Sequence, residues 1–326
     1  MTLSKFTVTS NLDPNVMPKG GIWCFIGLPK RGKTHNSARF NPSSDRSKTL
    51  YIDLENTILR FPQHSGTKVL PTAYYLPPKR DKLDAAGKKI LNSKNVPEQE
   101  IVPLTQRGYC INGEDKPLFS IREVVTILKA ASANGELKEY ESIVIDTVDV
   151  LQDLIEAHVI NEYNKEMKSV QGRLARGLGE IGERGTGWDN AKKLLLEILN
   201  DIYQIAQRHQ LELIFLIHSK TTTQLPDGKS QRDPAIRPST SLTLFGMVDI
   251  IGYVDRVSTH KSDGDDDYTV ANGLQYTVNF KTYSEELTGG SRFEHLVNKI
   301  VPFSYKEIKK EYEQSIKTNK EGESNE

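Results

Sequence analysis

Eight consecutive residues near the start of the sequence combine glycine, lysine and a hydroxyl side chain at spacings that suit phosphate binding. They match the pattern G-x-x-x-x-G-K-[ST] and run Gly27-Leu28-Pro29-Lys30-Arg31-Gly32-Lys33-Thr34. Glycine lets the backbone curl without a Cβ in the way, so that successive N–H groups can point at an anion. We therefore expect these residues, together with the adjoining His35, to hold the phosphates of a nucleotide.

Two side chains of this segment predict the ligand. Lys33 is in the position that reaches the β- and γ-phosphates, and the hydroxyl of Thr34 is in the position that binds Mg²⁺. An apolar run at residues 21–26 precedes the segment, and no helix breaker follows before Phe40. A buried strand leading into a helix is the setting in which such a loop binds phosphate. ATP and Mg²⁺ are therefore the expected cofactors.

A magnesium-bound triphosphate also needs a carboxylate at the end of a neighbouring strand. Asp146 follows the apolar residues 143–145, so it would emerge at the C-terminal end of a buried strand, where open α/β sheets bind ligands. We expect Asp146 to lie in the outer shell of the metal. A helix follows at once, so the same carboxylate could cap its N-terminus instead, and the two roles can coexist.

Hydrolysis further requires a group that polarises water. Asp53 and Glu55 end a second apolar strand at residues 49–52, and alternation would place both side chains on the same side. Glu55 is the preferred base, Asp53 could serve in its place, and both could instead be loop caps. His218 ends the apolar run at 213–217, from which it could sense the γ-phosphate or simply be a hydrogen-bonded polar group.

The segments that must position these residues alternate between strands and helices. The four apolar runs lack polar alternation, which is typical of parallel strands covered on both faces. Helical periodicity follows at 151–163 and 191–205, and a capping box at Ser120 and Glu123 starts a further helix. The expected fold is α/β, with a mainly parallel central sheet flanked by helices. From about residue 250 the pattern predicts a strand-rich C-terminal extension.

The same patterns predict the domain organisation. We expect one nucleotide-binding core over residues 20–308, preceded by a polar N-terminal arm at 1–19. Residues 61–118 are rich in proline and charge and too long for a plain loop, so they are interpreted as an insertion with partial structure. The Lys-, Glu-, Asn- and Ser-rich end predicts a disordered tail at 309–326 after a short amphipathic helix. No internal repeat is expected.

Composition excludes several classes of protein. Lys plus Arg and Asp plus Glu both number 43 in 326 residues, so the chain as a whole has no attraction to nucleic acid or anionic lipid, and any such surface must be local. No apolar run is long enough to span a bilayer and the N-terminus lacks a signal-peptide pattern, so we expect a cytoplasmic protein without a membrane partner. Two cysteines are too few for a disulfide framework.

Four segments together resemble the RecA-like ATPase core, and they read GLPKRGKT at 27–34, YIDLEN at 51–56, SIVIDT at 142–147 and IFLIHSK at 214–220. More narrowly, G-x-P-K-x-G-K-T and a late Lys-Thr followed by Gly-Gly-Ser-Arg are similar to phage-type single-domain RecA-like proteins, including the Sak-type single-strand annealing ATPases. The resemblance implies that Glu55 is the catalytic glutamate and Asp146 the Walker-B acid. It also implies that His218 links the γ-phosphate to a DNA-binding loop.

The resemblance has two further implications. Members assemble head to tail, and late basic residues of one subunit reach the next subunit's nucleotide, for which Lys281 and Arg292 are the candidates unless they are exposed edge charges. Members also hold DNA with two loops, here the glycine-rich residues 168–187 and residues 219–240. Cationic side chains in these loops would contact the phosphates of single-stranded DNA, unless the loops are merely solvated, and the candidates are Arg173, Arg176, Arg184, Lys220, Lys229 and Arg232.

These observations favour a Mg-dependent ATPase that oligomerises on single-stranded DNA in phage recombination or replication, inside a host cell. The alternative is a nucleotide-gated loader with weak ATPase activity that organises a single-strand-binding protein or another replication protein. A small-molecule kinase is less favoured, because no lid with paired arginines is evident. GTP specificity is disfavoured, because no Asn-Lys pair is followed by aspartate two residues after the lysine.

Overall fold

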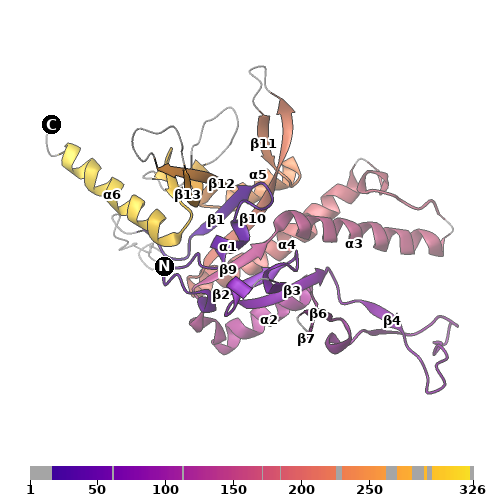
Figure 1. Ribbon diagram of the computed structural model, residues 1–326. Helices are drawn as coiled ribbons and strands as arrows, with labels where there is room; N and C mark the ends of the chain where they lie inside the picture. The colour runs from indigo at the N-terminus through magenta and orange to yellow at the C-terminus, as the bar shows by residue number, and fades with distance from the viewer. Residues whose placement is uncertain are drawn as a thin grey trace, which may run out of the picture.

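The computed structural model describes residues 17–60, 62–111, 114–170, 172–183, 185–224, 230–261, 270–280, 290–291 and 296–323. Its centre is an eleven-stranded sheet (Figure 1). In sheet order the strands are β15 (Ile300–Pro302), β13 (Val270–Asn279), β12 (Ile250–Lys261), β1 (Ile22–Gly27), β10 (Glu212–Gln224), β9 (Ser142–Asp146), β2 (Thr49–Asp53), β3 (Lys68–Tyr74) and β8 (Phe119–Ser120), with β11 (Ser230–Pro234) on β10 and β14 (Gly290–Ser291) on β12.

The strands from β12 to β8 all pair in parallel, whereas β13, β14 and β15 add antiparallel pairings at the β12 end. Every residue of β1, β2 and β9 is buried. This confirms the predicted parallel sheet and its strand-rich C-terminal extension. Because parallel strands share one direction, the carboxyl ends of β1, β10, β9 and β2 lie at one edge, where the predicted site residues are found.

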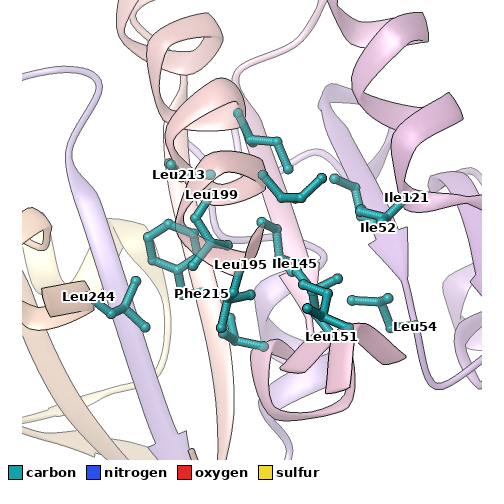
Figure 2. Close-up of a cluster of buried hydrophobic side chains, with 14 of the residues drawn as sticks. Ile52, Leu54, Ile121, Ile145, Leu151, Leu195, Leu199, Leu213, Phe215 and Leu244 are labelled. Carbon is teal, nitrogen blue, oxygen red and sulfur yellow. The ribbon is translucent and has the colours of Figure 1, made fainter. Parts of the chain in front are cut away.

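Both faces of the sheet are covered, and side chains of one strand alternate between two cores. Cys24 and Ile26 of β1 pack into one core, and Trp23 and Phe25 into the other. The first core lies under α2 (Ile121–Asn134), α3 (Val148–Ser169), α4 (Thr186–His209) and α5 (Pro238–Met247), and Figure 2 shows part of it. The second lies beside α1 (Lys33–Ser37) and under α6 (Tyr305–Glu323).

The start of α2 is fixed as the sequence predicts. The Ser120 side chain accepts from the Glu123 backbone N–H, and the Glu123 carboxylate accepts from the Ser120 N–H at 2.9 Å. The same carboxylate forms two hydrogen bonds with the buried guanidinium of Arg107, at 2.7 and 2.9 Å. A helix start and the insertion that precedes it are thereby joined through one side chain.

The C-terminal segment differs from the sequence prediction. Residues 309–323, expected to be mostly disordered, belong to α6. Ile308, Tyr312 and Ile316 recur on one helix face and are buried against the sheet. The Tyr305 hydroxyl also donates to the buried Glu212 carboxylate at 3.1 Å. Of the Lys and Glu residues that suggested disorder, those at 309–313 lie half-buried or exposed on an amphipathic helix.

The boundaries of the predicted insertion also change. β3 lies within residues 61–118 but belongs to the central sheet, because its Leu70 and neighbours pair in parallel with β2. The remainder forms two small antiparallel pairs, β4 (Lys79–Asp81) with β5 (Gln99–Ile101) and β6 (Tyr109–Ile111) with β7 (Glu114–Lys116). Figure 1 shows the β4 region extending away from the sheet as an arm.

The tip of this arm contains an internal repeat that the sequence analysis missed. Residues 83–98 form two consecutive eight-residue turns. Asp84 in the first and Asn92 in the second each accept from the backbone N–H groups two and four residues further on, at 2.9 to 3.1 Å. Gly87 and Asn95, also eight residues apart, both have a positive φ. The repeat is one of turn geometry, and few side chains are identical between the two units.

Candidate nucleotide-binding site

The loop between β1 and α1 has a backbone that requires glycine at both ends. Gly32 has a φ of 83°, and a Cβ there would lie 2.5 Å from the ring of Tyr276 on β13. A Cβ on Gly27 would lie 2.7 Å from the backbone oxygen of Val254 on β12. Residues of β12 and β13, the antiparallel pair at this end of the sheet, therefore pack closely against the loop. This strand, loop and helix are the arrangement that the sequence predicted.

Lys33 is buried and its ammonium lies inside the curl of the loop. Its Nζ donates to the backbone oxygens of Gly27 at 2.7 Å and Leu28 at 3.1 Å. Burial lowers the pKa of Lys33, and the nearby carboxylates of Asp146 and Glu55 oppose that shift. A buried cation held only by neutral carbonyl oxygens has affinity for an anion, so the loop is suited to a phosphate.

The remaining loop residues face outward to different degrees. Pro29 and Lys30 are exposed, and Arg31 forms an ion pair with Asp255 of β12 at 3.2 Å. His35 is half-buried, with its ring centroid 5.5 Å from that of His64. Burial lowers the pKa of His35, so it is neutral near pH 7. Nucleotide contacts by Lys30, Arg31 and His35 stay predictions.

Asp146 lies beside the loop at the end of β9 and is fully buried. Its Oδ2 accepts from the Thr34 hydroxyl at 2.7 Å and from the Tyr51 hydroxyl at 2.8 Å. Burial raises the pKa of Asp146 to about 6, against the hydrogen bond from Thr34. The N-cap of α3 is Thr147, so the alternative role of Asp146 as the helix cap is not what the structure has.

The oxygen atoms of Thr34 and Asp146 fit a Mg²⁺ ion. Mg²⁺ is commonly held by one or two carboxylates, substrate phosphates and water. Asp146 Oδ1 is buried and has no hydrogen-bond partner among the described residues, which leaves an oxygen available for a metal-bound water. In the part of the chain that the structure describes, no group of three or more His, Cys, Asp and Glu side chains could hold a metal alone. The ion would therefore depend on the nucleotide's phosphates.

The structure separates the roles of the two candidate bases after β2. Asp53 is buried, and its Oδ2 accepts from the backbone N–H of Ile58 at 2.9 Å, so it stabilises the turn that follows the strand. Glu55 instead points to His218, with 3.2 Å between Oε1 and Nε2. Burial and the Asp146 carboxylate raise the pKa of Glu55, and His218 partly offsets them. The Glu55 side chain is 23% exposed whereas Asp53 is fully buried, so Glu55 is the more accessible to water of the two.

His218 lies in β10, next to Gly27 in the sheet register. Asp149, in the first turn of α3, holds it at two points. One carboxylate oxygen accepts from the His218 backbone N–H at 3.0 Å, and the other is 2.8 Å from Nδ1. Sequence reasoning missed Asp149, as it missed Tyr51 and Tyr276. A second aspartate three residues after Asp146 was the available signal for Asp149.

Part of the glycine-rich segment after α3 is fixed by hydrogen bonds and by buried side chains. Asn164 makes two hydrogen bonds to the backbone of Ala175, at 2.7 and 2.8 Å, and Leu178 and Ile181 are buried. These contacts hold residues 175–181 against α3 and the core. Arg173 and Arg176 remain exposed on it.

The second cationic segment contacts α3 and α4 through Arg237. Arg237 forms two hydrogen bonds with Glu156 of α3, and its guanidinium stacks 3.1 Å from the ring centre of Trp188 in α4. One face of Trp188 is therefore covered by Arg237. Lys220 is exposed on β10, and the backbone of Arg232 on β11 pairs with Thr221.

Several predicted site residues lie outside the described part of the chain, namely Lys281, Arg292, Arg184 and Lys229. Most of the predicted N-terminal arm, residues 1–16, also lies outside it. Their roles stay predictions. Among the described residues, no helix combines the length and apolar character needed to cross a membrane.

Comparison with known proteins identifies the family. A family model described as AAA domain matches residues 22–293, from the first residue of β1 to just beyond β14. No curated protein matches the chain. The matched region contains the phosphate-binding loop, Asp146, Glu55 and His218, together with the parallel sheet that positions them. The chain therefore belongs to the AAA domain family, whose domains are of the P-loop NTPase type.

Proposed function

We propose that the protein is a Mg-dependent ATPase. The observation that carries this proposal is that residues from three neighbouring strands meet beside the loop: Asp146 at the end of β9 contacts Thr34, and Glu55 after β2 contacts His218 of β10. Cation, hydroxyl, carboxylate and base are thus grouped at one edge of the sheet, as phosphoryl transfer to water requires. Mg²⁺ held by Thr34 and Asp146 would supply positive charge to neutralise the negative charge that develops on the phosphates.

Each residue has a role in this proposal. Lys33 binds the β- and γ-phosphates, and Thr34 and Asp146 hold the metal and its water. Glu55 accepts a proton from the attacking water, and His218 positions Glu55 and lies where it can respond to the γ-phosphate. Phosphate release from ATP, GTP and CTP in the presence of Mg²⁺ tests the proposal. Absence of turnover with every nucleotide, from folded protein, would reject it.

We further propose that the ATPase acts on single-stranded DNA, as an annealing protein or recombinase of phage recombination or replication that assembles head to tail. Two observations support this: Arg173 and Arg176 of the first segment are exposed, and Arg237 of the second segment stacks on Trp188, which directly follows the first segment in sequence. In the assembly, Lys281 and Arg292 would reach a neighbouring subunit's nucleotide.

Fluorescence anisotropy with labelled single-stranded DNA tests the DNA role at low salt and saturating nucleotide. An R173A/R176A double variant should bind more weakly, with the slope of log K against log salt reduced by about 1 per arginine. A K129A/K138A double variant on and after α2 is the matched control and should bind like the wild type. No single-strand affinity in the wild-type protein would reject this role.

One observation favours a second candidate, a nucleotide-gated loader. The arm exposes large aliphatic side chains, about half accessible, which contribute nothing to either core: Leu83, Leu91, Val96 and Ile101. Lys82 N donates to Glu98 O at 2.8 Å, so residues 82–98 can be removed and their ends joined by a short Gly-Ser link. If the arm binds a replication partner such as a single-strand-binding protein, this deletion abolishes capture of that partner and leaves nucleotide binding intact.

A further inference from the structure

Three side chains from separate elements form a continuous polar chain beside the phosphate-binding loop. Asp149 comes from the first turn of α3, His218 from β10, and Glu55 from the segment after β2. The Asp149 carboxylate contacts His218 Nδ1 at 2.8 Å, and His218 Nε2 lies 3.2 Å from Glu55 Oε1. All three side chains are mostly enclosed, with between 14% and 23% of their surface exposed. The contacts are therefore shielded from water.

The geometry determines where the protons lie. Burial raises the pKa of Asp149, but hydrogen bonds from His218 outweigh it and hold that pKa below its ordinary value. An ionised carboxylate can only accept, so Nδ1 of His218 carries a hydrogen and donates it to Asp149. Nε2 then faces a carboxylate oxygen of Glu55, and two lone pairs at this distance repel. One proton must lie between His218 and Glu55.

The charges around His218 determine which partner carries that proton. Asp149 faces the imidazole from α3, Glu55 from the segment after β2, and Lys33 from α1. The hydrogen bond with Asp149 raises the pKa of His218, while burial and Lys33 act in the opposite direction. The carboxylates of Asp149 and Glu55 outnumber the single ammonium of Lys33, so the charged imidazolium form of His218 is favoured. The proton then belongs to His218, and Glu55 stays ionised, as a base must be.

We propose that Asp149 is a positioning residue of the ATPase: it fixes His218 with Nδ1 protonated and presents the Nε2–H to Glu55, so that a second proton is shared between His218 and Glu55 and the three residues act as a proton-sharing unit. The proposal rests on the proposed function for its catalytic meaning. The proton-sharing unit itself is a property of the nucleotide-free chain and can be measured without turnover. Without Asp149 the imidazole loses both its orientation and its charge, and Glu55 loses the cation that keeps it ionised.

The test is the titration of the His218 ring followed by NMR in the nucleotide-free full-length protein, with the signal assigned by its loss in H218Q. In the wild type Nδ1 should be protonated throughout and the titration midpoint should lie above the ordinary histidine value. In D149N, which keeps the size of the side chain but not the charge, the midpoint should fall by about 1 to 3 units. D149E, which restores the charge, should recover part of the shift.

D153N is the matched control, since Asp153 lies one turn further along α3 on its exposed side and should leave the midpoint unchanged. The pH dependence of ATP turnover is measured alongside. In D149N the acid limb of the rate profile should move and kcat should fall at least tenfold with KM little changed.

Each outcome decides something. An unchanged His218 midpoint in D149N overturns the proton-sharing unit. A lowered midpoint with an unchanged rate profile overturns the positioning role while the proposed ATPase stands. If the wild-type protein does not turn over ATP at all, the proposed function and the positioning role both fail, and the NMR titration alone decides whether the proton-sharing unit exists.

Discussion

Glu55 Oε1 and His218 Nε2 lie 3.2 Å apart, although β2, which Glu55 follows, and β10, which contains His218, are not neighbours in the sheet. β9 lies between β2 and β10, and it ends at Asp146, which contacts Thr34 of the loop. The proposed catalytic base, the histidine next to it and the proposed metal-binding carboxylate are therefore brought to one edge by the order of three parallel strands. Sheet order, rather than proximity in sequence, assembles the site.

Glu55→Gln should bind ATP normally but turn it over at least about 100-fold more slowly. An amide of the same size cannot accept a proton from water, and general-base catalysis typically contributes 10²- to 10⁴-fold. Steady-state phosphate release gives the rate and calorimetry gives the affinity. Glu139→Gln, at an exposed position, is the control. A near-normal rate in the Glu55 variant would mean that another group, with Asp53 the first candidate, is the base.

His218→Gln should lower the free energy of unfolding by about 1 to 2 kcal/mol at pH 6, because it removes a charge-assisted hydrogen bond to Asp149. The pKa of His218 is raised in the fold, so this stabilisation is fully present below about pH 6.5 and is lost as the pH rises through the raised value. Urea unfolding at pH 6 and pH 9 should show the smaller difference at pH 9.

His158→Gln provides an opposite control for that pH dependence. Burial lowers the pKa of His158, so protonation opposes folding there and the wild type loses stability at low pH. The free energy of unfolding of the His158 variant, compared with that of the wild type, should therefore be higher at low pH than at pH 9. The same pH trend in both histidine variants would contradict the assignment of the charge to His218.

Gly32→Ala should weaken nucleotide binding at least about tenfold. The positive φ costs an alanine roughly 1 to 2 kcal/mol, and its Cβ would meet the Tyr276 ring. Gly66 has a φ of 92° with open space where a Cβ would go, so G66A isolates the backbone cost and should not affect binding. The G32A/Y276A double variant should recover part of the affinity. Unchanged binding in G32A would mean that the loop does not hold the phosphates in this conformation.

Glu123→Ala should lower the free energy of unfolding by about 3 kcal/mol at pH 7, because it uncaps α2 and leaves the buried Arg107 unpaired. The hydrogen bond from Arg107 lowers the pKa of Glu123 to about 2. Its contribution is therefore present above about pH 4.3 and is lost as the pH falls toward 2.

The exposed pair of Arg80 and Glu100 is the comparison for that variant. Their nitrogen and oxygen are also 2.7 Å apart, but both side chains are more than a third accessible. E100A should therefore change the unfolding free energy by less than about 1 kcal/mol. Equal effects of E100A and E123A in denaturant melts would contradict the structural role given to Glu123.

The sequence predicted the parts of the fold that depend on local pattern. Buried strands, the loop at 27–34 and the capping box at Ser120 all have short-range signals, and the structure has them. The composition of the tail predicts disorder, but the spacing of Ile308, Tyr312 and Ile316 gives a helix with one buried face, which is what the structure has. The repeat in the arm has no sequence signal, because its two units form the same turn from different residues.

The site was less predictable than the fold. Asp53 and Glu55 are two residues apart in a strand pattern that places them on one side, and only the turn to Ile58 separates a structural carboxylate from a candidate base. Asp149 lies at the site because α3 begins there, and Tyr276 lies there because β13 pairs antiparallel with β12. Neither feature has a motif, because such contacts depend on how distant elements pack.

The most direct test of the account is calorimetric titration of the full-length protein with ATP and Mg²⁺. Wild-type protein should bind one nucleotide per chain, and Lys33→Ala should weaken binding by about tenfold to a hundredfold, because a charge-assisted contact to the phosphates is lost. Lys138→Ala, at an exposed position, should bind like wild type. No heat of binding in the wild type, or equal affinity in the Lys33 variant, would contradict the claim that residues 27–34 hold the phosphates.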